Sequence, residues 1–202
     1  MSVSSATLDF LSPAAARDGA IARSPMERMA RAAGARFEVR DGWNVAVDYA
    51  SPPEDTGWAD VSHLRKLELA DGRDFGTATR QGDGWLCPLT RSRSLLIGGS
   101  SPPPNGALDV TTCYAALTIF GPRAREVIAR FCALDLRLQV APPGSFRPGS
   151  IARQPGMILV EAPNRFLLLF GWALGEYLWT VVEDAGSHLG ARPATAEALS
   201  DA

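Results

Sequence analysis

Apolar and polar residues alternate in several short stretches of the chain, which is the pattern of half-buried strands. The clearest case is residues 43–49, where Trp43, Val45, Val47 and Tyr49 occupy every second position. Phe37 and Val39, on either side of Glu38, continue the alternation before it, and Asp41-Gly42 between the two stretches is a typical two-residue turn sequence. The pattern therefore predicts a β-hairpin over residues 37–49.

Further stretches have the composition of strands and are separated by turn or loop sequences. They are residues 64–69, 85–89, 94–97 and 114–120, followed by a second hairpin that joins residues 158–160 and 166–170. The unbroken apolar run at 166–170 predicts a strand buried on both faces. Residues 98–106, with three consecutive prolines, predict a loop, and the Pro-Gly pairs within 142–149 predict a long exposed loop.

Three stretches have the spacing of amphipathic helices. A short helix is predicted after Ser24, because Pro25 and Glu27 complete a capping box, and Gly34 ends it. The second spans residues 124–132 and the third spans residues 172–189. Because hairpins rather than single parallel strands separate the helices, we predict an α+β fold of antiparallel sheets with helices packed on one face.

Composition narrows the classes of function. The 202 residues are 46% hydrophobic and 21% charged, a composition typical of a globular chain. The net charge of −2 excludes the general basic surface that binds nucleic acid. No apolar stretch is long enough to span a bilayer, and the N-terminal residues lack the pattern of a secretory signal, which favours the cytoplasm. Cys87, Cys113 and Cys132 lie in apolar contexts without metal-binding spacing, so we expect reduced core residues and no metal site.

The N-terminal residues 1–23 have no sustained hydrophobic period, yet they contain apolar side chains, namely Leu8, Phe10, Leu11 and Ile21. We expect this segment to be an arm that is mobile or bound to a partner chain. Residues 24–202 are expected to form the folded domain, in which residues 98–110 are a candidate seam between two packed subdomains.

Three segments resemble the glycine-cleavage T-protein (aminomethyltransferase) superfamily and follow its order. The first contains Ser24-Pro25, Gly34-Ala35-Arg36-Phe37, Gly42-Trp43, Val47-Asp48-Tyr49, Ala59-Asp60-Val61-Ser62-His63 and Lys66-Leu67-Glu68-Leu69. The second contains Phe120-Gly121-Pro122-Arg123-Ala124 and Leu134-Asp135-Leu136. The third contains Tyr177-Leu178-Trp179, Ala185-Gly186 and Glu197-Ala198-Leu199. Within this superfamily, a chain of this length is most similar to the gamma subunits of heterotetrameric sarcosine oxidases.

The resemblance implies a T-protein-like fold without the C-terminal barrel of full aminomethyltransferases. It implies an accessory, non-catalytic role in a flavoenzyme complex that oxidatively demethylates sarcosine or a similar N-methyl amino acid and passes the one-carbon unit to tetrahydrofolate. It also implies that tetrahydrofolate, FAD, FMN and NAD are bound by partner subunits, with no cofactor in this chain.

Folate-binding members of the superfamily hold the pterin with a carboxylate, because the pterin edge presents two parallel donors to it. The nearest acid in the corresponding segment here is Asp83, and Trp85 beside it is a candidate stacking wall, so these two residues are the candidate folate-binding residues. The acidic turn that precedes the superfamily's penultimate strand is replaced here by residues 162–165, Ala-Pro-Asn-Arg.

Other conspicuous side chains have simpler interpretations. His63 is expected to have a structural role in the turn before a strand, and His188 to stabilise the end of the last helix. Trp43 is expected in the core, whereas Trp58, near two prolines, is expected to be an exposed contact for a ligand or subunit. Three functions stay open: an accessory subunit, a stand-alone folate-binding protein or one-carbon transferase, and a structural interaction module unrelated to amines.

Overall fold

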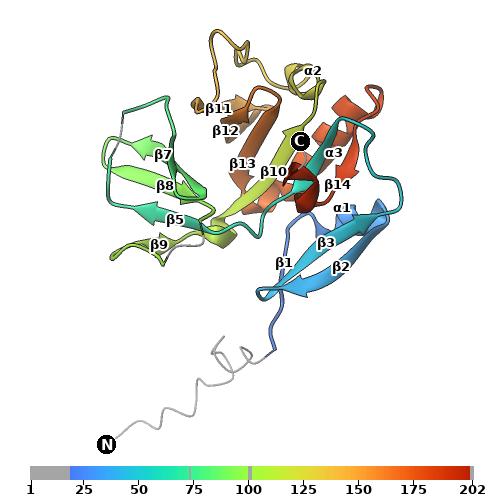
Figure 1. Ribbon diagram of the computed structural model, residues 1–202, viewed down its shortest axis with the longest axis horizontal. Coiled ribbons are helices and arrows are strands. Elements are labelled where there is room, and N and C mark those ends of the chain that lie inside the picture. The colour runs from blue at the N-terminus through green and yellow to red at the C-terminus, as the bar shows by residue number, and fades with distance from the viewer. Residues whose placement is uncertain (1–18, 73, 100–101, 201–202) are drawn as a thin grey trace, which may run out of the picture.

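The computed structural model describes residues 19–72, 74–99 and 102–200 (Figure 1). Its strands are β1 (Ala22–Arg23), β2 (Ala35–Arg40), β3 (Trp43–Tyr49), β4 (Gly57–Asp60), β5 (Lys66–Leu69), β6 (Thr79–Gln81), β7 (Gly84–Thr90), β8 (Arg93–Ile97), β9 (Leu108–Asp109), β10 (Tyr114–Phe120), β11 (Phe146–Ile151), β12 (Gln154–Ala162), β13 (Arg165–Gly171) and β14 (Arg192–Ala194). The helices are α1 (Glu27–Ala32), α2 (Ala124–Ala129) and α3 (Gly175–Ser187), with short 3-10 turns η4 (Thr111–Cys113), η5 (Trp172–Leu174) and η6 (Ala196–Ser200).

Within the described residues the strands form three sheets. One has three strands in the order β1-β3-β2, one has six in the order β11-β12-β13-β10-β4-β14, and one has five in the order β6-β7-β8-β5-β9. Figure 1 shows the six-stranded sheet in the middle, the five-stranded sheet on the left and the three-stranded sheet at the lower right. The molecule is therefore a mixed α+β fold in which strands dominate.

One face of the six-stranded sheet packs against the helices. Side chains from β10, β12 and β13 meet side chains from all three described α-helices in one buried cluster, which includes Leu117, Ile119, Ile158, Phe166, Leu168, Phe170, Met26, Val127, Ile128, Leu178 and Val182. Each of these side chains is fully buried. The alternation of β13 thus directs residues 166, 168 and 170 toward the helices.

The opposite face of the same sheet packs against the five-stranded sheet. Leu159, Leu167 and Leu169 share a second buried cluster with Trp85, Cys87, Leu95 and Ile97 of β7 and β8. Residues 166–170 of β13 are therefore buried on both faces, at 0–1% exposure, as their unbroken apolar run predicts.

The predicted N-terminal hairpin is confirmed. β2 and β3 pair antiparallel around a turn in which Asp41 has φ 49° and Gly42 has φ 78°, the left-handed geometry of a tight two-residue turn. β1 pairs parallel with the start of β3, through Ala22 and Trp43, so the last residues of the predicted arm join this small sheet. Residues 1–18, with Leu8, Phe10 and Leu11, lie outside the described residues.

Several expectations were wrong in detail because they considered only local sequence. The sheets are not purely antiparallel, since β1 pairs parallel with β3 and β14 pairs parallel with β4. Residues 142–149 are not one loop, because Pro148 and Gly149 belong to β11, which pairs along its length with β12. The helix predicted over 124–132 ends at Ala129, and Cys132 forms an isolated bridge with Ile151 instead.

The predicted capping box at α1 does not form. Ser24 Oγ accepts a hydrogen bond of 3.0 Å from the amide of Met26, but the helix begins at Glu27, so Met26 rather than Ser24 is its N-cap residue, and no side chain caps it. Glu27, however, does not return the bond, because its buried carboxylate pairs with Arg23 at 3.3 Å and Arg31 at 2.8 Å. Two ion pairs thus take the place of the hydrogen bond that the capping box predicts for Glu27.

Three predictions of burial were also wrong. Trp43 is half-buried rather than in the core, and its ring lies beside that of Trp172. Trp58 is 2% exposed rather than a surface contact, because β4 lies between β10 and β14 and points the indole into the cluster under the helices. Cys113 is exposed rather than buried, since it ends the turn η4 and precedes β10. Cys87 and Cys132 are buried, as expected.

Gly121 explains why a glycine follows β10 in the second superfamily-like segment. Its φ is +99°, and a Cβ there would lie 2.1 Å from the backbone oxygen of Asp55. The chain can therefore turn from β10 into α2, close against the loop before β4, only with a glycine at this position.

The turn between β11 and β12 carries backbone strain that can be tested. Ala152 has φ 50° and Arg153 has φ 62°, a left-handed conformation that costs a residue with a Cβ about 1–2 kcal/mol. We expect Arg153→Gly to raise the free energy of unfolding by about 0.5–1 kcal/mol, after allowance for the extra freedom of glycine in the unfolded chain. Urea unfolding measures this change. The control Gln154→Gly, at an ordinary strand conformation, should lower stability, and a similar loss for Arg153→Gly would contradict the strain.

Candidate functional site

A large cavity lies between the three-stranded sheet, the five-stranded sheet and η6, and we call it the central cleft. Its volume is about 820 Å³, within the range of small-molecule sites. It is lined by Arg40, Asp41, Trp43, Val45, His63, Leu64, Arg65, Gly98, Gly99, Asp109, Thr111, Thr112, Ala196 and Glu197. The lining thus comes from the β2–β3 hairpin, the turn before β5, the end of β8, the segment from β9 to η4, and η6.

A tight turn after β4 carries His63 to this cleft. The side chain of Asp60 accepts a 2.9 Å hydrogen bond from the amide of Ser62, an Asx-turn that ends the strand. Ser62 Oγ in turn accepts a 3.1 Å bond from the amide of Ala116 in β10. The amide of Leu64 closes the turn with a 3.0 Å bond to the carbonyl of Val61. These bonds fix the turn that carries His63, and none of them involves its side chain, so a structural role of the imidazole stays a prediction.

Lys66 lies fully buried beneath this turn, at 0% exposure. Its Nζ donates hydrogen bonds of 2.9 Å to the Ser62 carbonyl and 2.7 Å to the Leu64 carbonyl, and its amide donates one of 3.0 Å to Thr111 Oγ1. Burial lowers the pKa of Lys66 to about 8, against the opposing charges of Asp60 and Asp109. The ammonium group therefore holds the turn together, and its donors point at backbone rather than into the cleft.

The surroundings of His63 favour the neutral form of its imidazole. Burial is the main cause that lowers the pKa of its imidazole, and the charges of Lys66 and Arg40 act in the same direction. Asp60 and Asp41 oppose that shift. A neutral imidazole has one donor and one acceptor nitrogen, so at this position it can hydrogen-bond a polar ligand and exchange a proton with it.

Ion pairs and backbone bonds shape the rest of the cleft. Arg40 at the end of β2 pairs with Glu197 in η6, so the pair joins two sides of the cleft. Arg65 Nη2 donates a 2.5 Å hydrogen bond to the carbonyl of Gly99. Asp109 accepts a 2.9 Å bond from the amide of Thr111, and hydrogen bonding by Thr111 keeps the pKa of that carboxyl below its usual value. The cleft thus presents both charges, which suits a polar ligand with donors and acceptors on its edges.

The two candidate folate residues do not line the central cleft. Asp83 lies in the exposed turn between β6 and β7. Trp85 is 8% exposed in the core between the sheets, and the guanidinium of Arg80 lies 4.2 Å from its ring centroid. Burial raises the pKa of Glu161, and the charges of Arg165 and Arg80 oppose that shift. Folate binding by Asp83 and Trp85 stays a prediction.

Sequence reasoning missed Lys66, Asp109 and Thr111 as members of the cleft's framework. Lys66 and Glu68 alternate with Leu67 and Leu69, and this pattern suggests a solvent-facing lysine on a half-buried strand. Its burial depends on β9 and η4, which arrive from a distant part of the chain. The one local signal was the pair Asp109 and Thr111, since an Asp two residues before a Thr is typical of an Asx-turn.

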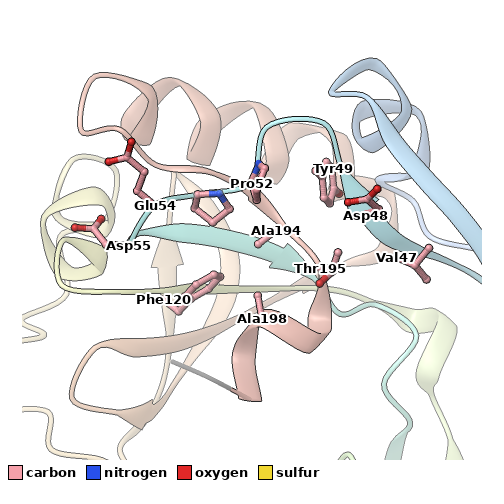
Figure 2. Close-up of a pocket in the computed structure, with 11 residues that line it drawn as sticks. Val47, Asp48, Tyr49, Pro52, Glu54, Asp55, Phe120, Ala194, Thr195 and Ala198 are labelled. Atoms are coloured by element: carbon pink, nitrogen blue, oxygen red, sulfur yellow. The ribbon is translucent and has the colours of Figure 1, made fainter.

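A second pocket, of about 450 Å³, lies between the end of β3, the loop before β4, and β14 with η6 (Figure 2). The carboxylates of Asp48, Glu54 and Asp55 lie around it, together with Phe120, Thr195 and the prolines of the loop. Asp48 lies 3.9 Å from Arg36. The pocket is acidic, in contrast to the mixed charge of the central cleft.

Two structural features are absent from the described residues. No group of three or more His, Cys, Asp or Glu residues there is arranged to hold a metal ion. In the same part of the chain, no helix combines the length and apolar character needed to cross a membrane.

Comparison with known proteins relates the fold to two solved structures. No family model matches the sequence, and neither does any curated protein. The heterotetrameric sarcosine oxidase from Corynebacterium sp. U-96, solved with pyrrole 2-carboxylate, includes a chain that matches with a TM-score of 0.66 and 17% identity, over 83% of this chain and 96% of that one. The glycine cleavage system aminomethyltransferase T from Bartonella henselae matches with a TM-score of 0.66 and 14% identity, over 87% of this chain but only 60% of that one. The chain therefore has a T-protein-like fold.

Proposed function

We propose that this chain is an accessory, gamma-like subunit of a heterotetrameric sarcosine oxidase-type flavoenzyme. The complex would oxidatively demethylate sarcosine or a similar N-methyl amino acid and pass the one-carbon unit to tetrahydrofolate. In this proposal the flavins FAD and FMN, NAD and tetrahydrofolate are bound by the partner subunits, and the complex works in the cytoplasm.

The observation that carries this proposal is the extent of the structural match. The similar chain of the sarcosine oxidase is covered over 96% of its length, whereas the aminomethyltransferase chain is covered over 60%. A match over nearly the whole of the first chain favours an equivalent unit, and a match over part of the second favours a shared fold with additional structure in the transferase.

The chemistry of the central cleft supports the accessory role. The buried ammonium of Lys66 bonds to two backbone carbonyls, and Arg40 is paired with Glu197 across the cleft. Both cations are thus committed to holding segments of the fold together. That arrangement favours a chain whose main task is to present a rigid surface to partner subunits.

Co-expression with the flavin-bearing alpha and beta chains of the same source tests the proposal. We expect a single complex that contains this chain after affinity capture through a partner chain and size-exclusion chromatography. The matched control is the same capture with this chain's gene replaced by that of an aminomethyltransferase, which shares the fold and should not co-elute. Elution of this chain separately at micromolar concentration would contradict the proposal.

A second candidate function is a stand-alone folate-binding protein or aminomethyltransferase-like transferase. The size and mixed charge of the central cleft favour it, since a pterin presents donors and acceptors on its edges. Titration calorimetry of the isolated chain with tetrahydrofolate decides between the two. This function requires heat of binding, and the absence of binding heat up to about 1 mM tetrahydrofolate, a binding free energy weaker than roughly 4 kcal/mol, would discard it. A reduced heat in Asp83→Asn would place the ligand at the predicted folate residues, and a reduced heat in Asp109→Asn would place it in the central cleft.

A further inference from the structure

A shallow groove separate from the central cleft lies between α2 and α3, and we call it the helix groove. Its volume is about 480 Å³, and it is lined by Ala129, Arg130, Phe131, Cys132, Ala133, Ala152, Arg153, Tyr177 and Val181. The lining comes from the end of α2, the β11–β12 turn and one face of α3. It shares no residue with the central cleft or with the acidic pocket.

Hydrogen bonds fix the three elements that form the groove. The Tyr177 hydroxyl donates a 2.7 Å bond to the carbonyl of Ala152. The amide of Ala152 donates a 2.9 Å bond to the carbonyl of Phe131. Tyr177 and Val181 lie one helical turn apart on α3, and Tyr177 is 40% exposed although it is anchored at its hydroxyl. The apolar floor is therefore rigid and open to solvent.

The groove carries positive charge on a chain whose net charge is −2. Arg130 and Arg153 are the charged residues among the described residues that line it. Arg130 Nη1 donates a 3.0 Å bond to the Ala185 carbonyl, and its Nη2 lies 3.8 Å from Glu126. Arg153 is exposed, and no hydrogen bond or ion pair involves it within the described part of the chain. Its guanidinium is thus available to a carboxylate.

The backbone at Arg153 adds an independent argument. Its φ of 62° is a conformation that glycine adopts without strain, and the comparable hairpin turn at Asp41-Gly42 does use a glycine. An arginine at this position keeps a charged side chain at the rim of the groove at a cost to the backbone. Strain that is held in place by neighbouring bonds is common where a side chain serves a ligand or partner.

We propose that the helix groove binds an acidic segment of a partner chain. An apolar side chain of that segment lies against Phe131, Tyr177 and Val181, and a neighbouring carboxylate pairs with Arg153. Binding of an acidic segment in the helix groove depends on the proposed function only for the identity of the partner chain. The groove itself selects its occupant by charge and apolar shape.

NMR titration of the full chain with short capped peptides tests this proposal. The probes are Ac-Glu-Phe-Glu-Leu-NH₂, its uncharged analogue with Gln in place of Glu, and its cationic analogue with Lys. We expect the acidic peptide to shift amide signals of Phe131, Arg153 and Val181, and to bind about five- to tenfold more tightly than the Gln peptide. Arg153→Gly should remove that preference while leaving the fold more stable.

The matched control is Arg93→Gly, which removes an exposed arginine on β8 of the five-stranded sheet and should leave the peptide preference unchanged. Equal binding of the acidic and cationic peptides, or an absence of groove shifts up to about 5 mM peptide, would overturn the proposal. Two other occupants would also overturn it. Groove shifts that grow with protein concentration alone indicate a second copy, and groove shifts caused by deletion of residues 1–18 indicate this chain's own N-terminal segment. Failure of these peptide experiments leaves the co-expression result unaffected, so the two proposals can fail separately.

Discussion

Replacement of Trp58 by Ala is expected to lower the free energy of unfolding by about 3–5 kcal/mol, the usual cost of truncating a fully buried aromatic side chain. The indole is 2% exposed on β4, inside the six-stranded sheet, and it packs edge-to-face on Trp179 of α3 at a centroid distance of 5.7 Å. Truncation would leave a cavity between sheet and helix that the closely packed neighbours cannot fill.

Urea unfolding followed by circular dichroism measures this change. Trp172→Ala is the matched control, because Trp172 is only half-buried. Its ring lies near the protein surface, with its centroid 6.1 Å from the ring centroid of Trp43. Its loss should be clearly smaller. Equal losses for the two variants would show that Trp58 does not occupy the core position that β4 gives it.

The buried Lys66 predicts a rise in stability with pH. Burial lowers its pKa to about 8 in the folded protein from 10.5, so both states are protonated below pH 8. Between pH 8 and 10.5 the unfolded chain binds more protons than the folded one, and stability therefore increases as pH rises. At about 1.4 kcal/mol per pH unit, the gain across this window reaches about 3 kcal/mol.

The measurement is the free energy of unfolding at a series of pH values for the natural chain and for Lys66→Met. Burial raises the pKa of the Tyr49 hydroxyl and the Cys87 thiol, so these groups lower stability at high pH in both proteins. The difference between the two profiles isolates Lys66 and should grow by about 3 kcal/mol between pH 8 and 10.5. Parallel profiles would mean that the ammonium is not buried as described.

Elements with strong local signals could be predicted from the sequence. The hairpin around Asp41-Gly42 carries its own alternation and turn residues, and the strand at 166–170 carries an unbroken apolar run. In both cases the information lies within about ten neighbouring residues, where periodicity and turn chemistry act together. The structure confirms both.

Elements that depend on distant partners could not be predicted. β4 and β14 pair parallel across a long sequence separation, and each is too short to show a period of its own. Trp58 therefore seemed to belong to a proline-rich loop, although β10 and β14 enclose the strand that carries it. Likewise, β11 contains Pro148 and Gly149, which locally favour a loop, and pairing with β12 overrides that preference.

In the candidate site, too, local features could be predicted from the sequence and features that depend on distant segments could not. The turn from Asp60 to Leu64 is local, and its Asx-turn residues are visible in the sequence. The central cleft is not local, because two sheets and η6 each contribute to it, and Lys66 is buried only when η4 covers it. A sequence can therefore indicate the turn that carries His63 without indicating the cavity that His63 lines.

The central claim, that this chain is one subunit of a larger flavoenzyme complex, is tested most directly by native mass spectrometry of the co-expressed and co-purified chains. We predict one species whose mass equals the sum of the partner chains, their bound cofactors and this 21.5 kDa chain, and whose gas-phase dissociation releases this chain without a bound flavin. Detection of this chain only as a free monomer or as a complex with copies of itself, beside an assembled flavoenzyme that lacks it, would contradict the claim.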